Sequence, residues 1–145
     1  MTLNQISAFV ENKPGKLEAL TEILSKNNIN MRAFSLAETS EFGIARFIAD
    51  DADNASACLK KEGIIHAVTK VLAAMIPDEP GGLNKVLNVL SKAGVNIEYM
   101  YAFHGGKNMP HAYMIFHVMD TDAACAALAG AGVGLISQEE LAKKA

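Results

Sequence analysis

Two six-residue segments of this sequence combine a polar residue, a Pro-Gly pair and a leucine in an order that suits ligand binding. They are Asn12-Lys13-Pro14-Gly15-Lys16-Leu17 and Asp78-Glu79-Pro80-Gly81-Gly82-Leu83. Glycine lets the backbone approach a ligand closely, and a helix that starts after the turn presents N–H groups and a partial positive charge to a carboxylate. Asn12 and Asp78 precede the turns and can accept a hydrogen bond from an ammonium group, and Asp78 adds charge attraction. Both turns therefore fit an α-amino acid, although a Pro-Gly pair is also a common way to begin a helix.

Other groups that could carry chemistry are few. The sequence has no GxSxG, no phosphate-binding GxxxxGK[ST] and no GxGxxG after a strand pattern, so we expect neither an enzyme nor a cofactor. His104, His111 and His117 raise a metal hypothesis, but they lack the spacing and the cysteine partners of a zinc site. Exposed hairpin histidines are the preferred interpretation, and no metal is expected. Cys58 and Cys125 lie among alanines and leucines and are expected to be buried, reduced thiols.

An internal repeat positions the two turns. Pro14 and Pro80 are 66 residues apart, and the same offset aligns Leu24-Ser25-Lys26 with Leu90-Ser91-Lys92 and Asn30-Met31 with Asn96-Ile97. A match that holds over this stretch without a gap indicates a duplicated unit. The boundary between the copies falls near Ala67 to Thr69, where no linker composition is present.

Each copy predicts the order strand, helix, strand, strand, helix, strand. Apolar residues at helical spacing follow each Pro-Gly pair, and these helices should end at Asn28 and Gly94, residue types that tolerate a left-handed backbone. The second helices should end at Gly63 and Gly132. The expected strands are 6–10, 30–37, 44–49 and 64–68 in the first copy, and 71–76, 96–103, 112–118 and 133–136 in the second, with hairpin turns at 38–43 and 104–110.

This order predicts an α+β protein made of two ferredoxin-like βαββαβ units. Each unit should have an antiparallel four-stranded sheet with two helices on one face. The predicted domains are residues 1–68 and residues 69–145, the second ending in a short tail from Ser137 onwards.

Length and charge narrow the class of protein further. Of the 145 residues, 50% are hydrophobic, which suits a packed core. The formal net charge is −3, and the lysines form no basic stripe of the kind that binds nucleic acid. No apolar run approaches the roughly 20 residues that cross a bilayer, so no membrane partner is expected. The first residues lack the pattern of a signal peptide, and we expect a cytoplasmic protein.

The turns and their flanking segments resemble the ACT domain. The pattern D/N-x-P-G-x-L, a helix and G/N-x-N-I/M occurs in both copies, ending at Asn28-Ile29-Asn30-Met31 and at Gly94-Val95-Asn96-Ile97. The resemblance implies allosteric, regulatory binding of an amino acid in amino-acid metabolism, at interfaces between ACT units. The implied ligand residues are Asn12, Pro14, Gly15, Leu17, Asn30 and Met31, and Asp78, Pro80, Gly81, Gly82, Leu83, Asn96 and Ile97.

The first copy is also similar to the start of the small regulatory subunit of acetolactate synthase. The alternative function is therefore a non-catalytic regulatory subunit that docks on an amino-acid biosynthetic enzyme such as acetolactate synthase. The repetition of the ACT unit in one chain favours a stand-alone tandem protein instead. The expected partners are a free amino acid and either a second copy of the chain or a metabolic enzyme.

Overall fold

The computed structural model describes residues 1–38, 40–104 and 111–143. Contacts divide the chain into two compact units: the first unit is Asn4–Thr69, and the second unit is Lys70–Ala145 together with Met1–Leu3. Each unit follows the predicted β-α-β-β-α-β order, with the last strand of the second unit reduced to a bridge. The predicted α+β class with two ferredoxin-like units is confirmed.

The first unit contains β1 (Leu3–Glu11), α1 (Lys16–Lys26), β2 (Met31–Glu38), β3 (Phe42–Ala49), α2 (Ala52–Lys61) and the start of β4 (His66–Ile76). Its strands lie in the order β2-β3-β1-β4. β3 is antiparallel to both of its neighbours, and Phe47 lies opposite Ile6 of β1 and Phe34 of β2. β2 therefore runs in the same direction as β1, with β3 between them.

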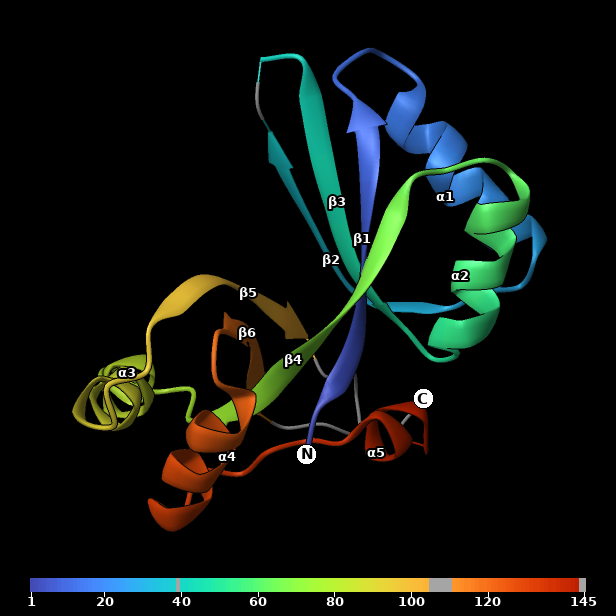
Figure 1. Cartoon of the computed structure of the whole chain (residues 1–145). Coiled ribbons are helices and arrows are strands. Elements are labelled where there is room, and N and C mark those ends of the chain that lie inside the picture. The colour runs from blue at the N-terminus through green and yellow to red at the C-terminus, as the bar shows by residue number, and fades with distance from the viewer. Residues whose placement is uncertain (39, 105–110, 144–145) are drawn as a thin grey trace. The chain divides into compact units, whose positions relative to one another are not determined.

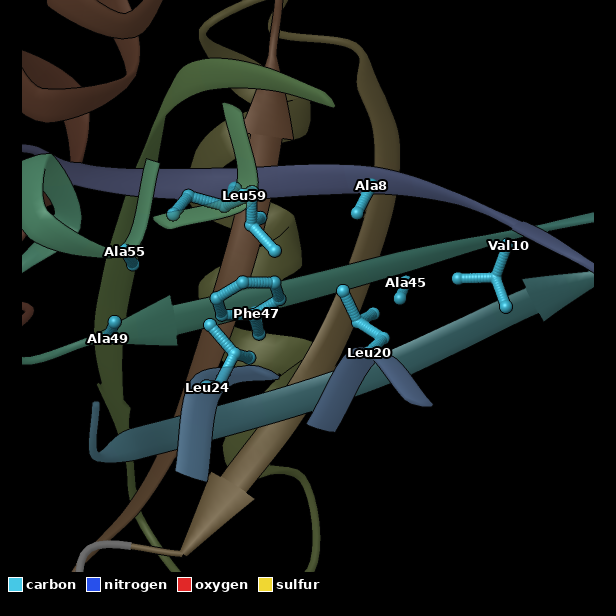
Figure 2. Packing of buried hydrophobic residues seen from close by; sticks show 10 residues of the cluster. Ala8, Val10, Leu20, Leu24, Ala45, Phe47, Ala49, Ala55 and Leu59 are labelled. Atoms are coloured by element: carbon cyan, nitrogen blue, oxygen red, sulfur yellow. The ribbon is translucent and has the colours of Figure 1, made fainter. Parts of the chain in front are cut away.

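Both helices of the first unit pack on one face of this sheet (Figure 1). The ring of Phe47 lies among leucines from the two helices, Leu24 of α1 and Leu59 of α2 (Figure 2), and all three side chains are fully buried. The alternation of strand residues places the small and apolar members of β1 and β3 on this face. The buried cluster is Ile6, Ala8, Val10, Leu20, Leu24, Ala45, Phe47, Ala49, Ala55 and Leu59.

The second unit contains the rest of β4, α3 (Gly82–Lys92), β5 (Ile97–His104), β6 (Ala112–Val118), α4 (Thr121–Gly130) and α5 (Gln138–Lys143). β6 is antiparallel to β4 and to β5, and Phe116 lies opposite Leu72 and Met100. The buried cluster is Leu72, Ala74, Ile76, Val86, Leu90, Phe116, Val118, Ala124 and Leu128. Phe116 therefore holds the place in this core that Phe47 holds in the first.

All four long helices end in the same hydrogen-bonded motif. After α1, the N–H of Ile29 donates to the carbonyl of Leu24 at 2.9 Å and the N–H of Asn28 donates to Ser25 at 3.0 Å. This pair of bonds is the Schellman motif, which needs a left-handed residue at the turn. Asn28 supplies it with φ 55°, and glycines supply it after the other three helices, at Gly63, Gly94 and Gly132. The prediction that the backbone is left-handed at these four residues is therefore confirmed.

Three parts of the chain differ from the sequence-based expectation. The predicted strands 64–68 and 71–76 are joined in one continuous β4, which begins at His66, two residues later than predicted, and no turn residue interrupts the sequence between them. The predicted strand 133–136 is a single bridge between Leu135 and Ala74, and Gly134 weakens strand character there. The hairpin turn expected at 104–110 lies, from residue 105 onwards, outside the described residues.

The expected C-terminal tail forms the short helix α5. Ser137 caps it: the N–H of Glu140 donates to Ser137 Oγ at 3.2 Å, and the N–H of Ser137 donates to the Glu140 carboxylate at 3.1 Å. This reciprocal pair is a capping box. Leu141 of α5 is buried. The burial of Tyr113 and, after it, the nearby negative charge of Glu140 raise the pKa of the Tyr113 hydroxyl. α5 is therefore packed against the rest of the second unit.

The helix-end motif predicts how substitutions at equivalent positions will differ. Gly94→Ala should lower the free energy of unfolding by about 1–2 kcal/mol, because a Cβ is disfavoured in the left-handed region. Asn28→Gly should be neutral or slightly stabilising, because it relaxes the same constraint. Urea unfolding of each variant measures both effects.

Gly130→Ala is the matched control for this comparison. Gly130 lies in α4 without a positive φ, and a Cβ there would have nothing within 4 Å. Alanine should stabilise this position by up to about 1 kcal/mol. Equal destabilisation by Gly94→Ala and Gly130→Ala would contradict the assignment.

Candidate functional site

The Pro-Gly segments form tight turns that lead directly into α1 and α3. In the first turn, the N–H of Lys16 donates to the carbonyl of Lys13 at 3.2 Å, and Gly15 has φ 84° and ψ −11°. In the second turn, the N–H of Gly82 donates to Glu79 at 3.0 Å, and Gly81 has φ 83° and ψ −1°. These values match a type II turn with proline second and glycine third. The first N–H of each helix is therefore bonded within its turn, and the N–H groups that can meet a ligand are those of the residues that follow in the first helical turn.

A cavity of about 390 Å³ lies against the first turn. It brings together four of the predicted ligand residues, and it adds residues from the hairpin formed by β2 and β3. The lining residues are Val10, Glu11, Asn12, Lys13, Pro14, Gly15, Leu17, Leu36, Glu38 and Gly43. The end of β1 pairs with the start of β3, with Glu11 opposite Phe42, so the hairpin lies at the same end of the sheet as the turn (Figure 1).

The hairpin supplies an acidic group that the sequence motif alone does not indicate. Asn12 is neutral, so the motif offers no carboxylate for a ligand ammonium at the first turn. Glu38 lines the cavity and provides one, while the other lining acid, Glu11, lies 3.3 Å from Lys13 Nζ. The signal that could have identified Glu38 is the ferredoxin-like strand order, which places the β2–β3 hairpin beside the turn.

Asn30 and Met31 do not lie at this cavity. β2 runs parallel to β1, so the start of β2 lies at the opposite end of the sheet from the first turn. There, both residues line a smaller hollow of about 220 Å³. The Asn30 side chain donates to Asp50 Oδ2 at 3.1 Å. The two segments of the implied site are therefore separated within the first unit.

The second turn has a different surrounding. Of its predicted residues, Gly82 lines a cavity on another side of α3, and a Cβ on Gly82 would lie 2.2 Å from the Pro77 carbonyl oxygen. This close approach requires glycine, whereas the equivalent position of the first turn is Lys16. Asp78, Pro80, Gly81 and Leu83 belong to the turn and the start of α3, and Asn96 and Ile97 lie at the start of β5.

A β-bulge at the start of β2 carries a short, partly buried ion pair. The bulge places Arg32 between paired residues Met31 and Ala33, and Arg32 Nε lies 2.6 Å from Asp50 Oδ1. Burial by itself raises the pKa of Asp50. Hydrogen bonds from Arg32 and Asn30, together with the Arg32 charge, outweigh burial and hold that pKa below its ordinary value of 3.8.

Metal-ligand clusters and membrane-spanning helices are both absent from the described part of the chain. Within residues 1–38, 40–104 and 111–143, no three His, Cys, Asp or Glu side chains gather as metal ligands would. No helix in that part of the chain has the length and apolar character needed to cross a bilayer.

Comparisons with known proteins extend the sequence resemblance. The chain matches the family described as "ACT domain pair" over residues 1–145. It is similar to the solved structure of protein BT0572 from Bacteroides thetaiotaomicron, with 39% identity and a TM-score of 0.91, over 99% of this chain and 97% of that one. No curated protein sequence matches the chain.

More distant structures share the fold. The ligand-free regulatory subunit of aspartate kinase from Thermus thermophilus has 16% identity and a TM-score of 0.63, over 88% of this chain and 91% of that one. The corresponding subunit from Thermus flavus has 16% identity and a TM-score of 0.60, over 89% and 92%. The expected likeness to the acetolactate synthase small subunit stays a prediction.

The lowered pKa of Asp50 predicts an acid-sensitive contribution to stability. The unfolded chain takes up the proton first as the pH falls, so this contribution is present above the unfolded pKa and is lost through the lower folded pKa. Urea unfolding of the wild type and Asp50→Asn, from about pH 7 to about pH 3, should show a difference that shrinks in acid. Glu22→Gln, which removes an exposed pair with Lys26, is the control and should change stability little at any pH. A difference for Asp50→Asn that is constant with pH would contradict the prediction.

Proposed function

Because this chain belongs to the family of ACT domain pairs, we propose that it is a regulatory protein that binds a free amino acid and catalyses no reaction itself. The observation that carries the proposal is the cavity at the first turn. It combines the start of a helix, a carboxylate and an apolar wall within one hollow of about 390 Å³. Pockets of this size class hold small molecules.

The charges around the cavity suit a zwitterion. The N–H groups in the first turn of α1 and the positive end of its dipole attract a carboxylate. Glu38 offers a charge-assisted hydrogen bond to an ammonium group, and Asn12 offers a neutral one. An α-amino acid carries both groups on one carbon and can meet both partners together.

The remaining walls favour an aliphatic side chain in the ligand. Val10, Leu17 and Leu36 are the apolar residues that line the cavity. Gly43 lets the Leu36 side chain pack closely against the hairpin, because a Cβ there would lie 3.1 Å from Leu36 Cδ1. A small branched or straight apolar side chain therefore fits better than a charged one.

The family resemblance implies that Asn30 and Met31 also contact the ligand. Under this proposal they can do so only if a second ACT unit takes part in the site. The two residues lie at the far end of the first unit from Gly15, so one unit cannot offer both segments to one ligand. A site that uses both would draw them from two ACT units, as a second copy of the chain could supply. The turn cavity is the part of the site that a single unit builds.

Glu38 gives the sharpest test of the proposed function. A thermal-shift screen of the twenty amino acids should find one or more apolar ones that stabilise the wild type, by about 2.7 kcal/mol at 100 times the dissociation constant. Calorimetry with that amino acid should show about tenfold weaker binding to Glu38→Gln, because a charge-assisted hydrogen bond becomes a neutral one.

Glu41→Gln is the matched control for this measurement. Glu41 belongs to the same hairpin and carries the same charge, but it does not line the cavity. Its substitution should leave the affinity unchanged. If no amino acid stabilises the protein, or if Glu41→Gln weakens binding as much as Glu38→Gln, the proposed site is wrong.

A further inference from the structure

The second unit contains a cavity that the turn motif does not account for. Its volume is about 330 Å³, and it lies between the end of β4, one side of α3 and the segment that follows α4. The turn residues Asp78, Gly81 and Leu83 are not among those that line it. The lining residues are Met75, Ile76, Pro77, Gly82, Lys85, Val86, Val89, His111, Ala131, Gly132, Val133 and Gly134.

The two copies can be compared at this place because their backbones are bonded alike. The N–H of Phe9 donates to Ile65 at 3.0 Å, and the N–H of Met75 donates to Gly134 at 2.8 Å. Phe9 and Met75 are equivalent under the repeat, so Gly134 corresponds to Ile65. The left-handed glycines Gly63 and Gly132 fix the same correspondence two residues earlier.

At five lining positions the second copy has a smaller side chain than the first. Two glycines, Gly82 and Gly134, replace a lysine and an isoleucine, and three valines replace leucine or isoleucine. The pairs are Lys16 and Gly82, Leu20 and Val86, Ile23 and Val89, Ile64 and Val133, and Ile65 and Gly134. At the two glycines the backbone or a neighbour takes the space, since a Cβ would lie 2.2 Å from the Pro77 carbonyl oxygen at Gly82 and 2.7 Å from Met75 Sδ at Gly134. The three valines, which come from α3 and from the segment after α4, are the smaller side chains that leave room for the cavity.

Two other positions gain a cationic or ionisable group. Lys85 replaces Ala19, and His111 replaces Phe42. The lining residues, all of them within the described part of the chain, include no aspartate or glutamate. Lys85 Nζ lies 3.4 Å from Glu79, but both side chains are largely exposed, and such a pair contributes little and can exchange partners. The cavity thus has an apolar interior, and Lys85 is the charged side chain that lines it, with Glu79 as its exposed partner outside the lining.

We propose that this cavity is a second small-molecule site, which takes a branched aliphatic carboxylate that carries no ammonium group. The valines and Met75 enclose the hydrocarbon, and Lys85 with His111 receives the carboxylate. An amino acid of the same skeleton binds more weakly here, because the lining offers no anionic partner for its ammonium group and desolvating that group is costly. The inference is independent of ligand binding at the first turn.

The test uses the full chain and 4-methylpentanoate as the probe, followed by nuclear magnetic resonance. Titration should shift the methyl signals of Val86, Val89 and Val133 and the amide signal of Gly134 in a saturable way. Leucine, which adds only the ammonium group, and 4-methylpentanamide, which removes the charge, should each bind at least about tenfold more weakly at these signals. Absence of saturable shifts at these residues, or equal affinity for leucine, would overturn the proposal.

Variants that restore the residues of the first copy test the cavity itself. Val89→Ile together with Val133→Ile should fill it and abolish the shifts, while Lys85→Met should weaken binding about tenfold. Val95→Ile is the matched control, because it also restores the residue of the first copy, Ile29, but lies outside the lining. The overall spectrum shows that each variant is folded. Binding that survives the double substitution, or that Val95→Ile reduces as strongly, would also overturn the proposal.

Discussion

The leucine that closes each long helix is the element on which both units depend. Leu24, Leu59, Leu90 and Leu128 are fully buried, and the carbonyl of each accepts the N–H of the aliphatic residue that follows the left-handed turn. One residue therefore fixes the helix end through its backbone and the core through its side chain. Because the chain must reverse within two residues and return to the sheet, the left-handed position cannot move without displacing that leucine from the core.

The four helix-end motifs and their buried leucines form a fixed frame. This frame explains how the two copies can carry different residues at the other positions of their helices and turns. The same four motifs end the helices in both copies, although Leu20 and Ile23 of α1 are replaced in α3 by Val86 and Val89, which line a cavity. The frame likewise permits Lys16 at one turn and Gly82 at the other. Differences in cavity and charge therefore occur on the faces and turns, where they leave the fold unaltered.

The sequence predicts the frame well because its signals are local and occur twice. Pro-Gly before a helix and Asn28 or Gly94 after it are short-range patterns whose backbone requirements leave few alternatives. The site was less predictable, because its walls come from different strands: Glu38 reaches the first turn only through the pairing of β2, β3 and β1. The helix α5 had a readable signal, the capping box that Ser137 begins, but a short segment after the last repeat element gives no periodicity to support it.

The β-bulges show which part of the repeat is a backbone requirement. Register shifts occur at equivalent places, at Arg32 in β2 and at Glu98 in β5, although these residues have opposite charges. Arg32 pairs with Asp50, while Glu98 Oε2 lies 2.6 Å from Nδ1 of His117, whose ring stacks on Tyr99 with a centroid distance of 4.8 Å. The first pair keeps its charge at every pH at which Asp50 is ionised, whereas the second is fully charged only when the imidazole is protonated. Since the bulge persists while the pairing chemistry changes, the bend in the strand is the shared requirement, and the charged residue at the bulge has a different partner in each copy, Asp50 in one and His117 in the other.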